Sequence, residues 1–378
     1  MIPTDEQVMI RDMARAFATE QIAPFAARWE DEAYFPRDVV TAMGKLGLMG
    51  MTVPQEWGGA GLDYVTYAIA LEEIAKGDGA LAIVMSGHNS VGCMPLLEYG
   101  TEAQKNRYLR PMAQGEMLSA FALTEARGGS DAGALTTRAA HREDGYIING
   151  NKQFITTGKN ADLCLVFAVT DPEAGKRGIS AFMVPTDTPG YEVVRVEKKM
   201  GQNASDTAQL AFNDMAVPGD ALLGEEGQGY RIALGNLEGG RIGIAAQAVG
   251  MAQAAYEAAL AYAQEREAFG KPIFEHQAVA FRLADMATQL EAARQLTWHA
   301  AALRSAGRKC LKEASMAKLF ATDMAEAVCS DAMQTLGGYG YLKDFPVERI
   351  YRGVRGARIY EGTNDIQKLV IARDLVAE

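Results

Sequence analysis

The stretch that decides the fold class reads GYIINGNKQFITTGKNADLCLVFAV, from Gly145 to Val169. It holds short runs of β-branched and aromatic residues that turn residues separate, a pattern typical of strands. Further runs of this kind follow at 179–184, 192–196 and 209–212, and Asp-Pro, Thr-Pro-Gly and Val-Pro-Gly-Asp punctuate them. The region 119–227 therefore predicts a compact antiparallel β domain rather than a series of βαβ units.

Helical patterns flank this β region on both sides. Residues 1–118 open with a capping Thr4 or Asp5 and predict a second helix near 67–76. Residues 228–378 open with an Ala-rich run at 244–266, which has high helix propensity. A bundle seam follows at Leu283, Met286, Leu290, Ala293 and Leu296, and a third helix at 312–336 should end at Gly337-Gly338. The fold class is α+β, mainly α, with domains at 1–118, 119–227 and 228–378.

Composition excludes several classes of function. The 378 residues include 37 Lys and Arg against 48 Asp and Glu, a net charge of −11, and no basic block suits nucleic acid. The longest apolar run, Leu163 to Val169, is too short to insert in a membrane, and the N-terminus lacks a targeting pattern, so we expect a cytoplasmic enzyme. Four scattered cysteines and four histidines predict neither disulfides nor a metal site.

Three segments could carry chemistry, although no GxSxG or GxGxxG motif is present. Residues 121–131 and 151–158 combine glycines and hydroxyls that suit close contact with an anion or a ring edge. Composition alone favours ordinary turns for both. Glu361, in the run Tyr360-Glu361-Gly362-Thr363, could be a base at a turn, where burial would raise its pKa. A helix-capping glutamate is the more common role for such a residue.

Five segments, in order along the chain, together resemble the acyl-CoA dehydrogenase family. They are Thr124 to Asp131, Phe154-Ile155-Thr156, Arg266 to Gly270 with His276-Gln277, Gln334 to Tyr341, and Ile359 to Thr363. The resemblance implies a homotetramer whose subunits have an N-terminal helical domain, a middle antiparallel β-barrel and a C-terminal four-helix bundle. It also implies FAD as cofactor and an acyl-CoA as substrate.

The resemblance also assigns residues to the cofactor and the substrate. Those implied to contact FAD within one subunit are Phe121, Leu123, Thr124, Gly129, Ser130, Phe154, Ile155, Thr156, Thr363 and Asp365. Those implied to reach the FAD of a neighbouring subunit are Arg266, Phe269, Gln277, Gln334, Gly337 and Gly338. Ser130, Glu238, Arg241 and Gly362 are implied to contact the acyl-CoA. Glu238 and Arg241 stand three residues apart on a predicted helix, so a surface ion pair is the alternative.

The implied reaction needs a base, because a C–H group beside a thioester is a weak acid. Glu361 is the implied base for the α-proton, with the β-hydride passing to flavin N5 and a trans-2-enoyl-CoA as product. Some family members place the base directly before the arginine that is Arg241 here, and Gly240 occupies that position. The resemblance to short-chain and isobutyryl members favours short or branched acyl chains, with electron-transferring flavoprotein as acceptor.

Two alternatives to this function remain. In addition, the sequence departs from the family pattern in the segment that precedes Glu361. The alternatives are a flavin acyl-CoA oxidase of the same fold and a non-catalytic scaffold. The departure is the run Tyr351 to Arg358, where Gly353 replaces the usual Asp and Gly356 adds a second glycine. Each interior glycine costs a helix about 1 kcal/mol relative to Ala. We expect the neighbouring arginines to lose a charge partner and the segment before Glu361 to be less rigid.

Overall fold

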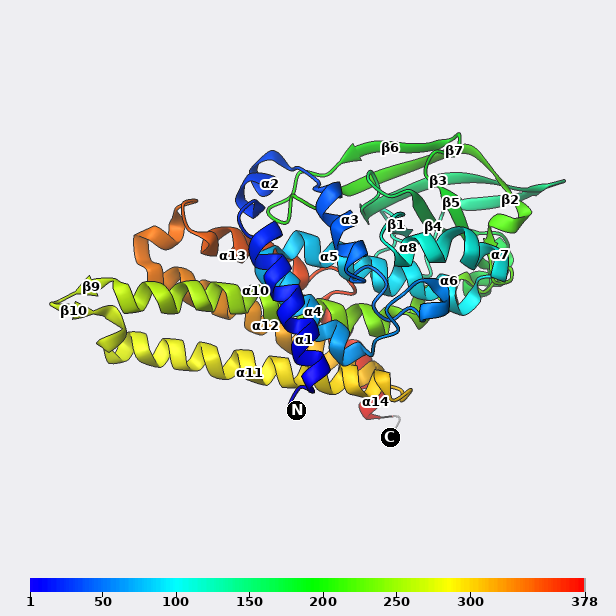
Figure 1. Cartoon of the computed structure of the whole chain (residues 1–378). Coiled ribbons are helices and arrows are strands. Elements are labelled where there is room, and N and C mark those ends of the chain that lie inside the picture. The colour runs from blue at the N-terminus through cyan, green and yellow to red at the C-terminus, as the bar shows by residue number, and fades with distance from the viewer. Residues whose placement is uncertain (377–378) are drawn as a thin grey trace.

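The computed structural model describes residues 1–376 and shows a β-sheet against one end of a group of long helices (Figure 1). The N-terminal helices cover one side of this group. They are α1 (Asp5–Phe17), α2 (Ala26–Glu32), α3 (Arg37–Lys45), α4 (Tyr64–Gly77), α5 (Gly79–Gly87), α6 (Met94–Tyr99), α7 (Glu102–Gln104) and α8 (Arg110–Ala113), with π-helical turns at Ala18–Ile22, His88–Cys93 and Lys105–Leu109. Thr4 caps α1 in a capping box with Gln7, as the sequence predicts.

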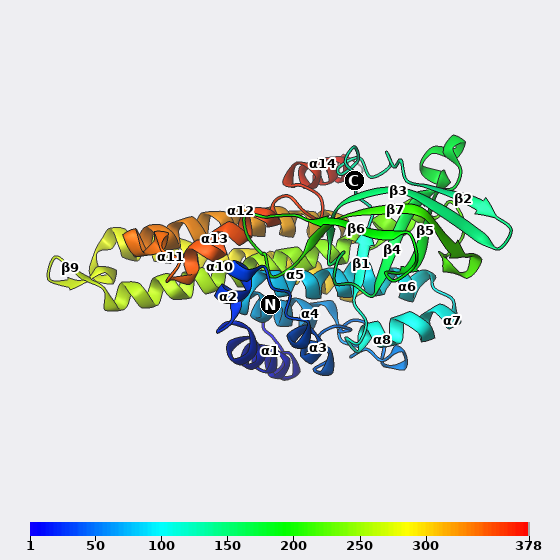
Figure 2. The same ribbon diagram turned by 90° about the horizontal axis from the view of Figure 1, so that it is seen from above.

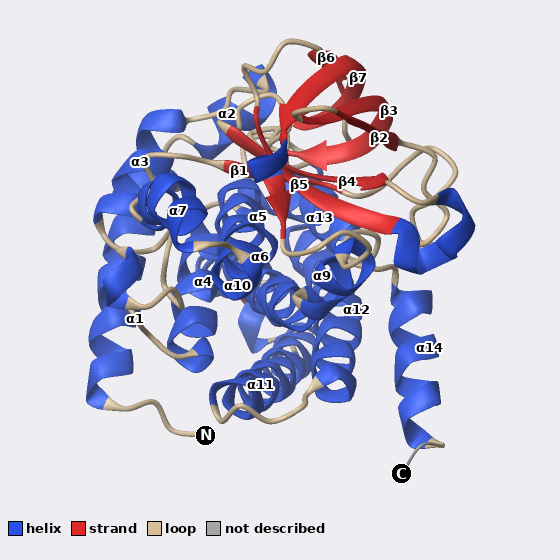
Figure 3. Cartoon of the chain, turned by 90° about the vertical axis from the view of Figure 1, so that its right-hand side faces the viewer, coloured by secondary structure: helices blue, strands red, loops and turns tan. Residues whose placement is uncertain are grey.

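The middle region forms one open, mixed sheet. Its strands are β1 (Ser119–Ala122), β2 (Arg138–Arg142), β3 (Gly145–Thr156), β4 (Leu163–Val169), β5 (Ile179–Pro185), β6 (Tyr191–Val196), β7 (Thr207–Pro218) and β8 (Leu222–Leu223). The order is β6-β7-β3-β2-β4-β5-β8, with β1 paired to β4. Figure 3 shows the sheet above the helices.

The expected order of helical, β and helical regions is confirmed, but the sheet differs from the expected antiparallel barrel in two respects. First, β1 runs parallel to β4, and β2 meets β4 in parallel at one pair, Arg138 with Val169. Second, β6 and β8 remain edge strands of the sheet, so it does not close. The β2–β4 contact is limited to that single pair, because β1 occupies the same edge of β4 at Leu163–Val166.

The C-terminal helices form the predicted bundle. They are α9 (Gly229–Gly235), α10 (Leu237–Glu265), α11 (Gln277–Ser305), α12 (Leu311–Leu336), α13 (Pro346–Ala357) and α14 (Asn364–Leu375). Alanines of α10 at positions 245, 248, 252, 255, 259 and 263 are fully buried. Their small side chains let α11, α12 and α4 approach α10 closely. Figure 2 shows α10, α11 and α12 lying along one another.

The apolar helical run from Gly79 to Tyr99 corrects the expectation that no segment has membrane-spanning length. Among residues 1–376 it is the one helix long and apolar enough to cross a bilayer, and 78% of its most apolar window is buried inside the protein. His88 and Asn89 within it are buried and bonded to backbone carbonyls, His88 to Met112 (2.9 Å) and Asn89 to Leu48 (2.9 Å). The run therefore packs as a core helix.

The two ends of α10 are far apart. At 1.5 Å per residue, the 26 steps from Gly240 to Arg266 correspond to about 40 Å. Near the far end, β9 (Glu267–Ala268) and β10 (Lys271–Pro272) form a small hairpin between α10 and α11. Figure 1 shows this hairpin at the opposite end of the molecule from the sheet.

Candidate active site

Glu361 lies in the short connection between α13 and α14. Its backbone is left-handed, with φ of 54°, a conformation that costs a non-glycine residue about 1–3 kcal/mol unless its surroundings enforce it. Gln367 enforces it here, because its Nε2 donates to the carbonyls of Glu361 (3.1 Å) and Gly362 (2.8 Å). Thr363 then caps α14 by accepting from the Ile366 backbone N–H. Hydrogen bonds thus fix the backbone both at Glu361 and at the start of α14.

A buried lysine also stabilises this turn through hydrogen bonds. Lys318 of α12 is fully buried, and its Nζ donates to the Gly362 carbonyl (3.0 Å) and to Asn364 Oδ1 (2.9 Å). The sequence did not indicate a role for Lys318. The sequence pattern could have indicated its burial, because Lys318 lies among the buried Ala314, Ala317 and Ala321 on the predicted helix. Charged residues are rarely fully buried unless they are paired.

The carboxylate of Glu361 faces the backbone of α10. A Cβ atom added to Gly240 would lie 2.9 Å from Glu361 Oε2, so only glycine leaves the carboxylate its place. Burial raises the pKa of Glu361, and the cations Arg241 and Lys318 oppose that rise. A carboxylate with a raised pKa and little water around it is a stronger base than an exposed one.

Arg241 is buried beside Glu361. Its guanidinium donates to Ser315 Oγ (3.0 Å), and its Nε finds no hydrogen-bond partner among residues 1–376. Burial lowers the pKa of Arg241, and the charges of Glu361 and Glu238 oppose this effect. The guanidinium therefore keeps one donor free within the site.

The alternative of an ion pair between Glu238 and Arg241 is not what the structure shows. Glu238 instead pairs with Arg304 of α11 at 2.8 Å, and Arg304 also stacks over the Tyr64 ring at 5.4 Å. The i, i+3 spacing was a poor guide because Arg241 turns into the core while Glu238 reaches the neighbouring helix.

The two segments that resemble flavin signatures lie side by side at the ends of β1 and β3. The Gln153 backbone N–H donates to the Thr124 carbonyl (2.9 Å), and buried Lys152 bonds the Leu123 carbonyl (3.1 Å) and Glu125 (2.9 Å). Burial alone would raise the pKa of Glu125, but Lys152 and hydrogen bonds from the 136–137 segment hold it at about 2. An ionised pair with Lys152 therefore joins the segments.

Phe154 projects outward from β3 where the strand bulges. Its φ is 59°, its side chain is 63% exposed, and the pairing with β7 shifts between Lys152 and Ile155. The extra residue of a bulge re-aims a side chain. Ile155 points into the core, Thr156 is half-buried, and Gly129 and Ser130 are exposed. An outward aromatic beside glycines and hydroxyls fits a planar cofactor ring.

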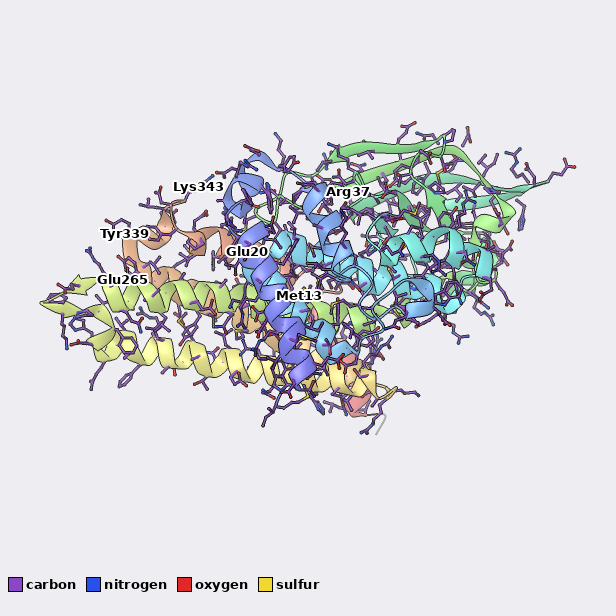
Figure 4. All side chains as sticks on the ribbon, viewed as in Figure 1. Met13, Glu20, Arg37, Glu265, Tyr339 and Lys343 are labelled. Atoms are coloured by element: carbon purple, nitrogen blue, oxygen red, sulfur yellow. The ribbon has the colours of Figure 1, made fainter. Side chains whose placement is uncertain are left out.

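The remaining flavin-related residues lie at the far end of the bundle. Arg266 and Phe269 are exposed at the hairpin after α10, Phe269 at 97%, and Gln277 begins α11. Gln334, Gly337 and Gly338 end α12, where Gly337 closes the helix with φ of 61° as expected. Figure 4 labels Glu265 and Tyr339 at this end. Within a single chain, these residues at the end of the bundle are therefore far from both Phe154 and Glu361.

The arginines of α13 have charge partners, contrary to expectation. Arg352 binds Glu348 (2.8 Å) and Glu30 of α2 (2.7 Å). Arg355 lies 3.6 Å from Glu326, and Arg358 pairs with Asp323 (2.8 Å) and Glu326. Carboxylates from α2, α12 and α13 itself thus supply the charge partners that the sequence pattern was expected to lack. Among residues 1–376 there is no group of three or more His, Cys, Asp and Glu that could hold a metal ion.

Comparison with protein-family models matches nearly the whole chain. The acyl-CoA dehydrogenase N-terminal domain matches residues 4–116, the middle domain 120–215 and the C-terminal domain 227–376. An "Acyl-CoA dehydrogenase" of Bacillus subtilis (strain 168) is 50% identical over 373 residues, 99% of this chain and 98% of that protein. The "Short-chain specific acyl-CoA dehydrogenase, mitochondrial" of Bos taurus is 48% identical, covering 97% of this chain and 89% of its own length.

Solved structures agree with these matches. Butyryl-CoA dehydrogenase from Megasphaera elsdenii superposes with a TM-score of 0.97 and 40% identity, over 100% of this chain and 99% of that one. A chain from a structure described as "Electron transferring flavoprotein of Acidaminococcus fermentans: Towards a mechanism of flavin-based electron bifurcation" has a TM-score of 0.98 and 45% identity, over 100% of both chains.

Proposed function

The chain belongs to the acyl-CoA dehydrogenase family, and from that premise we propose that it oxidises a short- or branched-chain acyl-CoA to the trans-2-enoyl-CoA with Glu361 as the base. The enzyme is an acyl-CoA dehydrogenase and its cofactor is FAD. The observation that carries the assignment of the base is the position of the half-buried Glu361 carboxylate against Gly240. Some family members carry their base at the position of Gly240. In this chain the glycine has no side chain, so the carboxylate of Glu361 can occupy that space.

The residues around Glu361 suit removal of an α-proton. The raised pKa of Glu361, caused by burial, gives the carboxylate the proton affinity that the step requires. In the left-handed turn the Glu361 backbone N–H has no hydrogen-bond partner among residues 1–376, so it can donate to the thioester carbonyl, where charge develops. Arg241 offers its free Nε–H to the polar part of the substrate. FAD, when bound, supplies the acceptor for the β-hydride.

The residues that would hold FAD fall into two sets. Phe121, Leu123, Thr124, Gly129 and Ser130 lie in β1 and the segment after it, Phe154, Ile155 and Thr156 end β3, and Thr363 and Asp365 lie at the start of α14. The set of Arg266, Phe269, Gln277, Gln334, Gly337 and Gly338 lies toward the far end of α10, where Arg266 is about 40 Å from Gly240 by helix rise. We propose that the second set serves a neighbouring subunit of a homotetramer. The divisions at 118/119 and 227/228 are our proposed domain boundaries.

Bulky side chains beside Glu361 support a short acyl chain. Glycines of α10 let tyrosines of α4 come close: a Cβ at Gly239 would lie 3.3 Å from the Tyr64 ring, and one at Gly243 would lie 2.7 Å from the Tyr67 hydroxyl. Tyr67 is fully buried, and the charge of Glu361 adds to the burial that raises its pKa. Two tyrosines near the base leave less room for a long chain. The bovine relative is itself described as short-chain specific.

We propose electron-transferring flavoprotein as the electron acceptor. One matched chain comes from a structure described by that protein's name. A flavin acyl-CoA oxidase of this fold is the second candidate, and it would differ in passing the electrons of the reduced flavin to oxygen. A purely structural role would not require Glu361 to adopt a left-handed backbone with its carboxylate turned toward Gly240.

A panel of acyl-CoA substrates tests the proposal. The purified enzyme is assayed with C4 to C16 straight-chain and isobutyryl-CoA substrates, with a dye acceptor or with oxygen alone. We expect the highest kcat/KM with the shortest or branched substrates and little peroxide in oxygen. Preference for long chains would contradict the substrate class, and stoichiometric peroxide would identify an oxidase.

A further inference from the structure

Three side chains next to the base form a closed ring of hydrogen bonds. Gln202 Nε2 donates to the Tyr360 hydroxyl (3.1 Å), and that hydroxyl donates to Gln247 Oε1 (2.9 Å). Gln247 Nε2 closes the ring by donating to Gln202 Oε1 (3.3 Å). Each group acts as donor and acceptor in one consistent direction, so any one of them, if removed, leaves the other two incomplete.

The ring joins three elements that are separate in sequence. Gln202 lies in the loop between β6 and β7, Gln247 lies in α10, and Tyr360 directly precedes Glu361. Both glutamines are also anchored to backbone: Gln202 Nε2 donates to the Gly353 carbonyl (2.7 Å) and Gln247 Nε2 to the Gly79 carbonyl (2.7 Å). The ring is therefore fixed to α13 and to the start of α5.

The two unusual glycines of α13 make room for this ring. A Cβ at Gly356 would lie 3.1 Å from the Tyr360 ring, and a Cβ at Gly353 would lie 3.4 Å from Gln202 Cγ and 2.7 Å from Met251 Cε. Gly201 packs on the same surface, since its Cβ would lie 2.8 Å from the Arg352 backbone. The glycines thus form a notch in the helix that the Gln202 side chain and the Tyr360 ring occupy.

The loop that carries Gln202 also contacts the strand that carries Phe154. The Thr157 backbone N–H donates to the Asp206 carbonyl (3.0 Å), and the Lys159 N–H donates to Asp206 Oδ2 (2.9 Å). Gln202 itself has a left-handed backbone, with φ of 57°, as Glu361 has. The next residue, Asn203, is bonded through its N–H to Glu30 of α2 (2.6 Å). One loop thus connects the β3 segment to the turn of the base.

We infer that Gln202, Gln247 and the Tyr360 hydroxyl are positioning residues that fix the Glu361 carboxylate relative to the β3 segment through this ring. The inference rests on the proposed function, because the base and the hydride acceptor must meet opposite sides of one substrate. None of the three touches the reacting atoms in our account. A displacement of the base by about 1 Å can reduce a rate by about a hundredfold.

The test compares single and double variants of the ring with a matched glutamine elsewhere. The variants are Tyr360→Phe, Gln202→Met, Gln247→Met and the double variant Y360F/Q202M. The control is Gln104→Met, because Gln104 is also buried and donates to two backbone carbonyls, Asp220 (2.8 Å) and Leu222 (2.9 Å), away from the site. FAD content, thermal stability, acyl-CoA affinity and the rate of anaerobic flavin bleaching are measured for each.

We expect each ring variant to slow bleaching by about tenfold or more, with FAD content and acyl-CoA affinity retained. The double variant should be no slower than the slower single variant, because both changes break the same ring. Gln104→Met should lower the melting temperature equally without slowing bleaching. Bleaching by the ring variants at the wild-type rate, or rate losses that multiply in Y360F/Q202M, would overturn the inference. Failure of the wild-type enzyme to bleach with any acyl-CoA would instead overturn the proposed function.

Discussion

At the scale of residues, the site depends on close approach between Glu361 and a glycine that presents no side chain. The family resemblance predicts Glu361 as the base and Gly240 as an empty alternative position, but not that a Cβ atom at Gly240 would lie only 2.9 Å from the Glu361 carboxylate. Lys318, Gln202 and Gln247 could not be assigned from sequence. Their roles come from hydrogen bonds across elements far apart in the chain, which no local pattern encodes.

Replacing Gly240 by alanine should slow the reaction without loss of FAD. The added Cβ would lie 2.9 Å from Glu361 Oε2, so the carboxylate must move. We expect bleaching by acyl-CoA to slow by about tenfold to a hundredfold, as small misplacements of a catalytic group do. The control is Gly235→Ala, where the new Cβ meets only the Tyr99 hydroxyl, at 3.9 Å. Equal rates for G240A and G235A would contradict the position assigned to the carboxylate.

Lys318 should set the pH dependence of the reaction. Its charge lowers the pKa of Glu361, in opposition to burial, while burial lowers the pKa of Lys318 to about 8. Removal of the cation in Lys318→Met raises the pKa of Glu361 further, so the carboxylate accepts a proton at higher pH. The acidic limb of the bleaching rate should therefore move to higher pH.

Lys318→Arg keeps the positive charge and serves as the control for that shift. The arginine variant should retain most of the wild-type pH profile even if its stability falls. An acidic limb in K318M that stays in place or moves to lower pH would show that Lys318 does not act on Glu361 through its charge.

At the scale of elements, α13 shows why local rules mislead near a site. Helix propensity predicts that Gly353 and Gly356 weaken the helix, at about 1 kcal/mol each. The structure shows that both sit where a neighbouring side chain approaches, with the helix braced by arginine pairs to α2 and α12. The long helices and most strands follow from periodicity. The parallel pairing of the four-residue strand β1 does not, because register between distant strands depends on tertiary packing.

Gly356→Ala separates the stability of α13 from the activity of the enzyme. Alanine gains about 1 kcal/mol of helix propensity, which the contact at 3.1 Å with the Tyr360 ring partly offsets. We expect the melting temperature to change little while the bleaching rate falls, because Tyr360 is displaced. Differential scanning calorimetry and anaerobic bleaching on the same sample measure both. A variant with a lower melting temperature and unchanged bleaching would contradict the role of the notch.

At the scale of the whole molecule, the length of α10 separates the two sets of flavin-related residues. The sequence predicts the sets only through family resemblance, and the structure places them at opposite ends of a 29-residue helix. The net charge of −11 also matters at this scale. An acyl-CoA is itself an anion, so its binding depends on local donors such as Arg241 rather than on the overall field.

Subunit complementation tests whether the hairpin at the end of α10 serves a neighbour. Subunits with Arg266→Ala and Phe269→Ala keep their own Glu361, and subunits with Glu361→Gln keep an intact hairpin. Each variant alone should be inactive, whereas co-expression should restore part of the activity through mixed sites. Met9→Ala, an exposed apolar change on α1, controls for effects of the surface substitution. No restoration in tetramers shown to be mixed would contradict a site shared between subunits.

The most direct test of the account is anaerobic mixing of the Glu361→Gln enzyme with butyryl-CoA while the flavin absorption band at about 450 nm is followed. The side chain keeps its size but loses its basicity, so we predict normal FAD content and no bleaching, while the wild-type enzyme bleaches fully. Bleaching of the variant at the wild-type rate would show that another group removes the α-proton.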